Sequence, residues 1–281
     1  MTKRKSLKNY FNEISNKLRR GNIRVNVNDE REERFALALI EEAFNNKATR
    51  LRISTFGLST LPKQIGKLRN LTYLEITDPR LTTIPAEIGN LINLEELLFA
   101  DFLPSINIDD TGATTPQACR ISHLPPEIGE LSNLQTLNLA YNNLTSLPPE
   151  VGKLLNLQVL SLSRNSLTEL PAELGSFTKL TYLDASHNYL SELPTSTNQL
   201  VNIDTLVLWG NQLPIPLEIL AKFKEPHIIL NYYFSVIQQK RKSINEIKLL
   251  VVGQGSVGKT SLVQQILHGT FDQNQDGRDI H

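Results

Sequence analysis

The chain has 281 residues, 40% of them apolar, and its 29 Lys and Arg residues balance 29 Asp and Glu residues. This composition predicts a globular protein with one or two folded cores and excludes an intrinsically disordered chain. The zero formal charge argues against nucleic acid as a partner, and the single cysteine excludes an intramolecular disulfide framework and favours a reducing compartment. No apolar run approaches the roughly 18 residues of a membrane span, so we expect a cytoplasmic protein without a transmembrane segment.

Residues 1–47 are expected to form a helical arm and a cap. The basic start, MTKRKSLKNYFNEISNKLRR, lacks the apolar core of a secretory signal and is typical of a solvated amphipathic arm. In the following NDEREERFALALIEEAFNNKAT, Asn28 or Asp29 is a candidate N-cap. The apolar face of this helix is expected to comprise Ala36, Leu37, Ile40 and Phe44, widened by Leu39 and Ala43. Such a helix would cover the open end of a repeat array, so its aromatic residues are expected in the core.

Residues 48–222 repeat with a period of 23 residues. LQTLNLAYNNLTSLPPEVGKLLN begins at Leu134, and matching segments begin at Leu157, Leu180 and Ile203. Earlier copies begin at Ala48, Leu71 and Leu94, which makes seven repeats. The spacing from Leu94 to Leu134 exceeds the period by 17, so we expect an insertion of that length within residues 101–120, forming a surface loop. Cys119 falls in this insertion and is expected to be a free thiol without a catalytic role.

The repeated pattern, LxxLxLxxNxLxxLPxxIGxLxN, resembles leucine-rich repeats. The resemblance implies an α/β solenoid whose short parallel strands line a concave face and whose leucines form one continuous core. A recurring asparagine is expected to point inward and satisfy backbone groups where the chain leaves each strand, and a recurring proline is expected to precede a brief helical turn. The asparagines are Asn142, Asn165, Asn188 and Asn211, whereas the first three repeats carry Phe56, Pro79 and Phe102 there, so their turns are expected to be satisfied differently.

A protein-binding patch is predicted from the residues that point outward from the strands and from the turns just beyond them. Large aromatic and arginine side chains are enriched at protein contacts. The candidate residues are Tyr141, Arg164, Tyr182, His187 and Trp209. An alternative remains open, in which Trp209 packs against the following segment and the others are ordinary exposed surface. His187 has no second ligand or carboxylate at a matching spacing, so we predict neither a metal site nor a catalytic base there.

Residues 223–246 are predicted to form a linker helix that leads away from the last repeat, with an apolar face comprising Ile228, Ile229, Tyr232, Tyr233 and Ile237. Residues 247–281 then change pattern. IKLLVVG is typical of a strand buried on both faces, GQGSVGKT matches the phosphate-binding loop GxxxxGK[ST], and TSLVQQILHG predicts a helix.

This order of strand, loop and helix predicts a nucleotide phosphate site. Backbone N–H groups and the helix N-terminus would bind the β-phosphate, Lys259 would contact the β and γ oxygens, and Thr260 would offer its hydroxyl to Mg²⁺. The predicted phosphate-binding residues are Gly253, Gln254, Gly255, Ser256, Val257, Gly258, Lys259, Thr260 and Ser261. No catalytic residue is predicted.

Together, the repeats, EPHIILNYYF, NEIKLLVVGQGSVGKTSLV and FDQNQDGRDI resemble the Roco family, in which leucine-rich repeats precede a Ras-like GTPase module called Roc and a dimerising COR domain. The resemblance implies GTP and Mg²⁺ as ligands and a role in intracellular signalling. The family's DxxG and NKxD-type motifs do not follow Thr260, and residues 275–277 read QDG where the family's switch I offers a threonine before a glycine. We therefore expect a partial GTP-binding module, truncated shortly after the P-loop, with weak or no nucleotide binding in this chain alone.

Two functions remain open at this point. One is a repeat scaffold that binds a protein partner on the concave face and is joined to the first part of a Roco-type GTP-binding module, or carries its P-loop only as a remnant. The other is the N-terminal portion of an active Roco GTPase whose catalytic remainder lies outside the chain. Some Roco relatives are protein kinases, but this sequence contains no kinase glycine-rich loop, HRD or DFG motif.

Overall fold

The computed structural model describes residues 29–99 and 119–245. The predicted N-terminal arm, most of the insertion and the phosphate-binding loop therefore lie outside the described residues. The chain divides into two compact units, Met1–Ser235 and Val236–His281, and the repeats belong to the first. Among the described helices, none is both long and apolar enough to cross a membrane.

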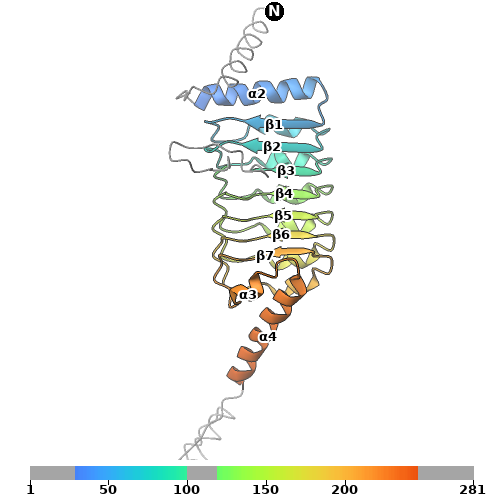
Figure 1. The fold of residues 1–281 in the computed structure, drawn as a ribbon. Helices are drawn as coiled ribbons and strands as arrows, with labels where there is room; N and C mark the ends of the chain where they lie inside the picture. The colour runs from blue at the N-terminus through green and yellow to red at the C-terminus, as the bar shows by residue number, and fades with distance from the viewer. Residues whose placement is uncertain (1–28, 100–118, 246–281) are drawn as a thin grey trace, which may run out of the picture. The chain divides into compact units, whose positions relative to one another are not determined.

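Helix α2 (Asp29–Asn45) lies across one end of the repeat stack, next to the first strand (Figure 1). Ala36, Ile40 and Ala43 are buried, so the predicted cap helix is confirmed and its narrow apolar stripe faces the first repeat. Phe44 was expected in this face but is 53% exposed. Phe44 lies at the edge of the buried stripe, about 40° around the helix from Ile40 and one residue before the helix ends.

Within the described residues, seven parallel strands form one sheet in simple sequence order, which confirms the predicted repeat architecture. The strands are β1 (Arg50–Ser54), β2 (Tyr73–Thr77), β3 (Glu96–Leu98), β4 (Thr136–Asn138), β5 (Val159–Ser161), β6 (Tyr182–Asp184) and β7 (Thr205–Val207). Residues one period apart pair directly, as Leu160 does with Leu183. Across the insertion, Leu97 pairs with Leu137, so the extra residues leave the register of the sheet unchanged.

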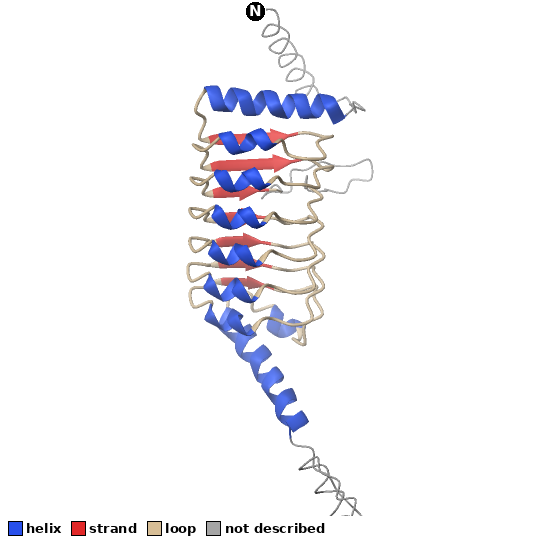
Figure 2. Ribbon diagram, turned by 180° about the vertical axis from the view of Figure 1, so that it is seen from behind, coloured by secondary structure: helices blue, strands red, loops and turns tan. Residues whose placement is uncertain are grey.

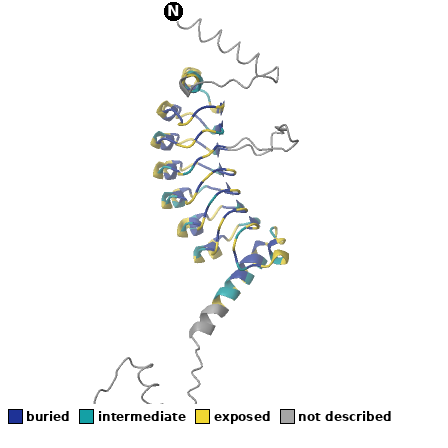
Figure 3. Ribbon diagram, turned by 90° about the vertical axis from the view of Figure 1, so that its left-hand side faces the viewer, coloured by how far each residue is buried: buried dark blue, intermediate teal, exposed yellow. Residues whose placement is uncertain are grey.

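Short 3-10 helices run along the side of the stack opposite the strands (Figure 2). They are η1 (Lys63–Lys67), η2 (Ala86–Asn90), η3 (Pro126–Glu130), η4 (Pro149–Lys153), η5 (Ala172–Ser176) and η6 (Thr195–Gln199). Each follows a proline in an extended conformation, as at Pro148 (φ −66°, ψ 143°). Figure 3 shows the strands on the inner side of this gently curved stack. The recurring leucines of the repeats are buried and form its core.

The helical turns approach one another closely, and glycine permits this approach. A Cβ added at Gly129 would lie 2.4 Å from the carbonyl oxygen of Glu150 in the next repeat, a distance that no real Cβ tolerates. In η6 the place of this glycine is taken by Asn198, which is exposed. The next repeat has the α-helix α3 (Leu217–Leu220) instead of a 3-10 helix.

Buried asparagines connect successive repeats at the strand exits, as predicted. The Oδ1 atom of Asn165 accepts a hydrogen bond from the Leu144 N–H at 3.0 Å. Its Nδ2 group donates to the carbonyl oxygens of Leu139 at 2.8 Å and Leu162 at 2.9 Å. Asn188 and Asn211 make the equivalent three bonds. Asn142 accepts from the Ile121 N–H and donates to the Leu139 carbonyl oxygen of its own repeat, so all four side chains satisfy backbone groups where the strands end.

The early repeats use different side chains at this point. In the second repeat Asp78, which is 0% exposed, accepts hydrogen bonds from the Gly57 and Leu58 N–H groups at 2.9 and 2.8 Å. In the third repeat Cys119 donates from Sγ to the Ile76 carbonyl oxygen at 3.4 Å, in the place where Asn165 donates to Leu139. Cys119 is 2% exposed, so its prediction as part of a surface loop was wrong.

Helix α4 (Pro226–Asn245) begins as a second cap rather than only a linker. Ile229, Leu230 and Tyr233 are buried, and the Tyr233 hydroxyl accepts a hydrogen bond from the Leu193 N–H at 2.8 Å. The predicted helix is therefore present. No further repeat covers this end of the stack. The first half of α4 packs there, against the sixth repeat, as α2 does at the other end.

Candidate functional site

Three residues of the predicted partner site lie in a row along the strand exits. Tyr141, Arg164 and His187 occupy equivalent places in successive repeats and have left-handed φ values of 58°, 54° and 53°. All three are exposed. The N–H groups of Tyr141 and Arg164 donate to the next repeat, at 2.9 Å in both cases, which fixes the backbone of the row. The guanidinium carbon of Arg164 lies 5.3 Å from the centre of the Tyr141 ring, within cation–π range.

Tyr182 belongs to the strand face and not to this row. It lies in β6 and is half-buried between its neighbours. Burial, followed by the nearby carboxylate of Asp184, raises the pKa of the Tyr182 phenol above its usual value. The phenol is therefore a neutral hydrogen-bonding group, with both donor and acceptor capacity.

Trp209 departs from the predicted row because Gly210 occupies the left-handed place in the last repeat, with φ 71°. The Trp209 ring is 37% exposed and makes an edge contact with Phe223, with a 5.4 Å separation of ring centres. The packing alternative thus holds for part of this side chain. A Cβ added at Gly210 would meet His187 Nδ1 at 2.7 Å, so the His187 ring lies against this glycine.

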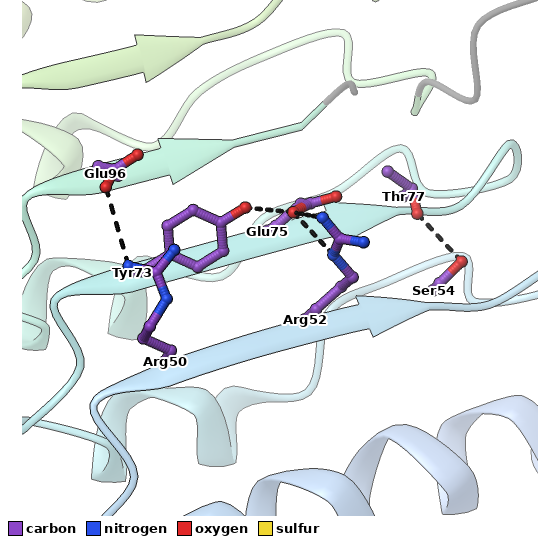
Figure 4. A network of polar contacts seen from close by, with 7 residues as sticks. All are labelled: Arg50, Arg52, Ser54, Tyr73, Glu75, Thr77 and Glu96. Atoms are coloured by element: carbon purple, nitrogen blue, oxygen red, sulfur yellow. Dashed lines mark hydrogen bonds and ion pairs between the residues drawn. The ribbon is translucent and has the colours of Figure 1, made fainter. Parts of the chain in front are cut away.

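A second cluster on the strand face was not predicted as a site. It comprises Arg50, Arg52, Tyr73, Glu75 and Glu96 from the first three strands (Figure 4). Arg52 binds the same Glu75 oxygen through Nε at 2.8 Å and Nη2 at 2.6 Å, and the Tyr73 hydroxyl donates to that oxygen too. The Arg50 guanidinium lies 3.9 Å from the centre of the Tyr73 ring.

The cluster is held together by a buried charge. The Glu75 side chain is only 3% exposed, whereas that of Arg52 is 65% exposed. The hydrogen bond with Glu75 raises the pKa of Arg52, while burial and then the bond to Glu75 raise the pKa of Tyr73. Residues 23 apart in the sequence are direct neighbours on this face, as Arg52 and Glu75 are. The sequence therefore contained the information needed to predict this ion pair.

The described residues show no metal centre. They contain no group of three or more His, Cys, Asp or Glu side chains that could hold a metal ion, and His187 has no such neighbours. The predicted phosphate-binding residues, 253–261, and the Mg²⁺ ligand among them lie outside the described residues.

A sequence profile of the leucine-rich-repeat family matches residues 117–167 and 132–190. These residues include Asn142, Asn165 and Asn188 and strands β4 to β6. The chain contains leucine-rich repeats. A solved leucine-rich-repeat protein of Leptospira interrogans is 31% identical over 62% of this chain and 52% of its own, with a TM-score of 0.40. The chain thus spans about half the length of that protein. No curated protein matches the sequence.

Proposed function

We propose that the leucine-rich repeats bind a protein partner through Tyr141, Arg164, Tyr182, His187 and the exposed edge of Trp209. The observation that carries this proposal is the row of left-handed, non-glycine residues. A left-handed backbone costs an ordinary L-residue about 1 kcal/mol, and Gly210 shows that glycine suits the same turn. Because the turn itself does not need a tyrosine, an arginine or a histidine, these side chains are best explained by contacts that they make outside the chain.

Site-specific photo-cross-linking on the full chain tests this proposal. A benzophenone amino acid replaces Tyr182, and the same amino acid at Leu155 is the control, because Leu155 is 56% exposed but follows η4 on the opposite side of the stack. We expect a discrete adduct from position 182 in an extract of the cells that make the protein, and none from position 155. Adducts of equal yield from both positions would refute a dedicated strand-side surface.

Substitutions then identify the contact residues. Arg164→Ala and His187→Ala remove exposed side chains and should reduce the adduct formed from position 182 while leaving the far-ultraviolet circular dichroism unchanged. Trp209→Ala also removes the contact with Phe223, so a loss of binding counts only if the unfolding midpoint is preserved. Unchanged adduct yield in all three variants would contradict the assignment of this patch.

We also propose that residues 253–261 bind nucleotide phosphates as part of a Roco-type GTP-binding module in a signalling protein. The support is the sequence order of an apolar strand, GQGSVGKT and an amphipathic helix. All nine residues would contact phosphates or Mg²⁺ and none would contact the base, so this chain alone is expected to bind GTP and ATP alike and at most weakly. Isothermal titration of both nucleotides with Mg²⁺ tests this, with Lys259→Ala as the variant and Lys248→Ala as its control. Binding that is unaffected by Lys259→Ala would exclude this loop.

A further inference from the structure

The strand exits of the repeats carry an uneven distribution of charge. Each repeat leaves its strand through residues that we call the exit edge, and in the described chain these are residues 55–57, 78–80, 119–120, 141–143, 164–166, 187–189 and 210–212. The exposed basic side chains of the exit edge are Arg80, Arg120, Arg164 and His187. Its one carboxylate among these described residues, Asp78, is 0% exposed and accepts backbone hydrogen bonds. The exit edge therefore presents no described carboxylate to solvent.

Exposed aromatic rings accompany these cations on the exit edge, and one of them, Tyr141, lies between Arg120 and Arg164 in the order of the repeats. Phe56 is 52% exposed, Tyr141 39% and Tyr189 54%, and all three belong to the exit edge. Arg164 already lies over the Tyr141 ring, so its guanidinium plane is held in place before any partner arrives. Ordered arginines beside exposed aromatic rings are the residues that dominate protein interfaces.

Carboxylates that reach solvent lie elsewhere in each repeat. Several lie just before or within the 3-10 helices, beside lysines such as Lys63, Lys67 and Lys153, and others lie on or next to the strands; they include Glu87, Glu127, Glu150, Glu169, Glu173, Glu192, Glu95, Glu96, Asp184 and Asp204. The exit edge therefore differs from the rest of the repeat stack, where side chains of both charges are interspersed. A partner that binds along the exit edge is selected for negative charge.

We propose that the exit edge binds an acidic, extended polypeptide segment that runs along the stack across the third to fifth repeats. This inference rests on the proposed protein-binding function and specifies the chemistry of the partner. Neighbouring parallel strands are about 4.8 Å apart, so Arg120 and Arg164, two repeats apart, are separated by about 10 Å along the stack. About three residues of extended chain span that distance, and Tyr141 lies between the two arginines.

A polypeptide fits this edge better than a nucleic acid does. Affinity for nucleic acid comes mainly from several phosphate contacts and needs an extended positive field. The exit edge offers three arginines and one histidine, spread over five repeats and backed by the glutamates of the same repeats. Planar guanidinium groups instead pair with single carboxylates through two parallel hydrogen bonds, and the exposed rings supply the apolar contact that an acidic peptide with aromatic residues would use.

The test uses the full chain and three fluorescent probes of known composition. The first is a peptide of about 12 residues with alternating Glu and Tyr, long enough to cross the edge. The second is the same peptide with Gln in place of Glu, and the third is an oligothymidylate of about 12 nucleotides. The variant is Arg120→Gln with Arg164→Gln, and the matched control is Arg31→Gln with Arg69→Gln, because both control residues are exposed and lie away from the exit edge.

We expect the acidic peptide to bind by fluorescence polarisation and the Gln peptide to bind at least about tenfold more weakly. The exit-edge variant should weaken binding of the acidic peptide at least about tenfold, whereas the control should change it less than about twofold. Raising the salt from about 50 to 200 mM should weaken binding in the unsubstituted chain and have less effect in the variant. Circular dichroism of the variant establishes that it is folded.

Three results of the binding assay would overturn the inference. They are equal binding of the Glu and Gln peptides, equal loss in the variant and its control, and tighter binding of the oligothymidylate than of the acidic peptide. Self-association that disappears in the exit-edge variant would also overturn it, because the acidic occupant would then be a second copy of this chain. None of these results decides the proposed partner site itself, which depends on the cross-link from position 182.

Discussion

Replacing Asn165 with alanine should destabilise the repeats by about 3 kcal/mol, which is large for a residue that carries no charge. The Asn165 side chain is 7% exposed and holds the Leu144 N–H and two carbonyl oxygens. Without it, the buried N–H loses its partner, at a cost of about 1 to 3 kcal/mol. The carbonyl oxygens of Leu139 and Leu162 each keep a second asparagine, so each loses only about 0.5 to 1 kcal/mol.

Urea unfolding followed by far-ultraviolet circular dichroism measures this change in the full chain. The matched control is Asn143→Ala, because Asn143 is exposed in the neighbouring repeat and should shift the free energy of unfolding by less than about 0.5 kcal/mol. The fluorescence of the single tryptophan, in the last repeat, shows whether the loss spreads through the stack. Equal destabilisation by the two variants would refute the view that inward asparagines replace the sheet ladder at the strand exits.

Three further predictions concern other parts of the stack. Gly129→Ala should lower the free energy of unfolding in urea by about 2 kcal/mol, because the added Cβ would clash with the next repeat. Asn198→Ala, in the last 3-10 helix, should leave it nearly unchanged, and equal effects of the two substitutions would contradict this packing. Arg52→Ala should lower the free energy of unfolding by about 1 kcal/mol, because the buried Glu75 carboxylate would keep only a tyrosine hydroxyl, and a neutral effect in the same assay would show that water replaces the guanidinium. Burial raises the pKa of the Cys119 thiol to about 12 from 9.0, so iodoacetamide should label it at pH 8 at least about a hundredfold more slowly in the folded chain than in urea. Since the unfolded thiol loses its proton first, this residue's contribution to stability should fall as the pH rises above about 9, and fast labelling of the folded chain would show that the site is open.

The period of 23 residues is sufficient to predict the seven strands, their parallel order and the prolines that begin the helical turns. It succeeds because each repeat contacts only its neighbours, so local pattern and packing have the same spacing. It fails where the spacing is interrupted. The inserted residues shift Cys119 into the place of the asparagine, and the leucine-rich-repeat pattern accepts either asparagine or cysteine there.

The candidate site was predicted in part. Tyr141, Arg164 and His187 align because they precede the ladder asparagines, which the sequence makes visible. The position of the Trp209 side chain depends on the left-handed turn at Gly210 and on the contact with Phe223. The repeat period predicts neither of these features. The arginine and glutamate cluster on the first strands was visible as residues one period apart, but its buried carboxylate depends on how the neighbouring side chains cover Glu75.

The left-handed turns restrict which amino acids can supply the recognition surface. Side chains branched at Cβ are strongly disfavoured at a φ near 55°, so valine, isoleucine and threonine are poor choices at Tyr141, Arg164 and His187. Asparagine, aspartate and glycine enter this conformation most readily. Engineering the repeats to bind another ligand would therefore use a restricted set of amino acids at these three positions. A library of such variants could be small enough to screen completely.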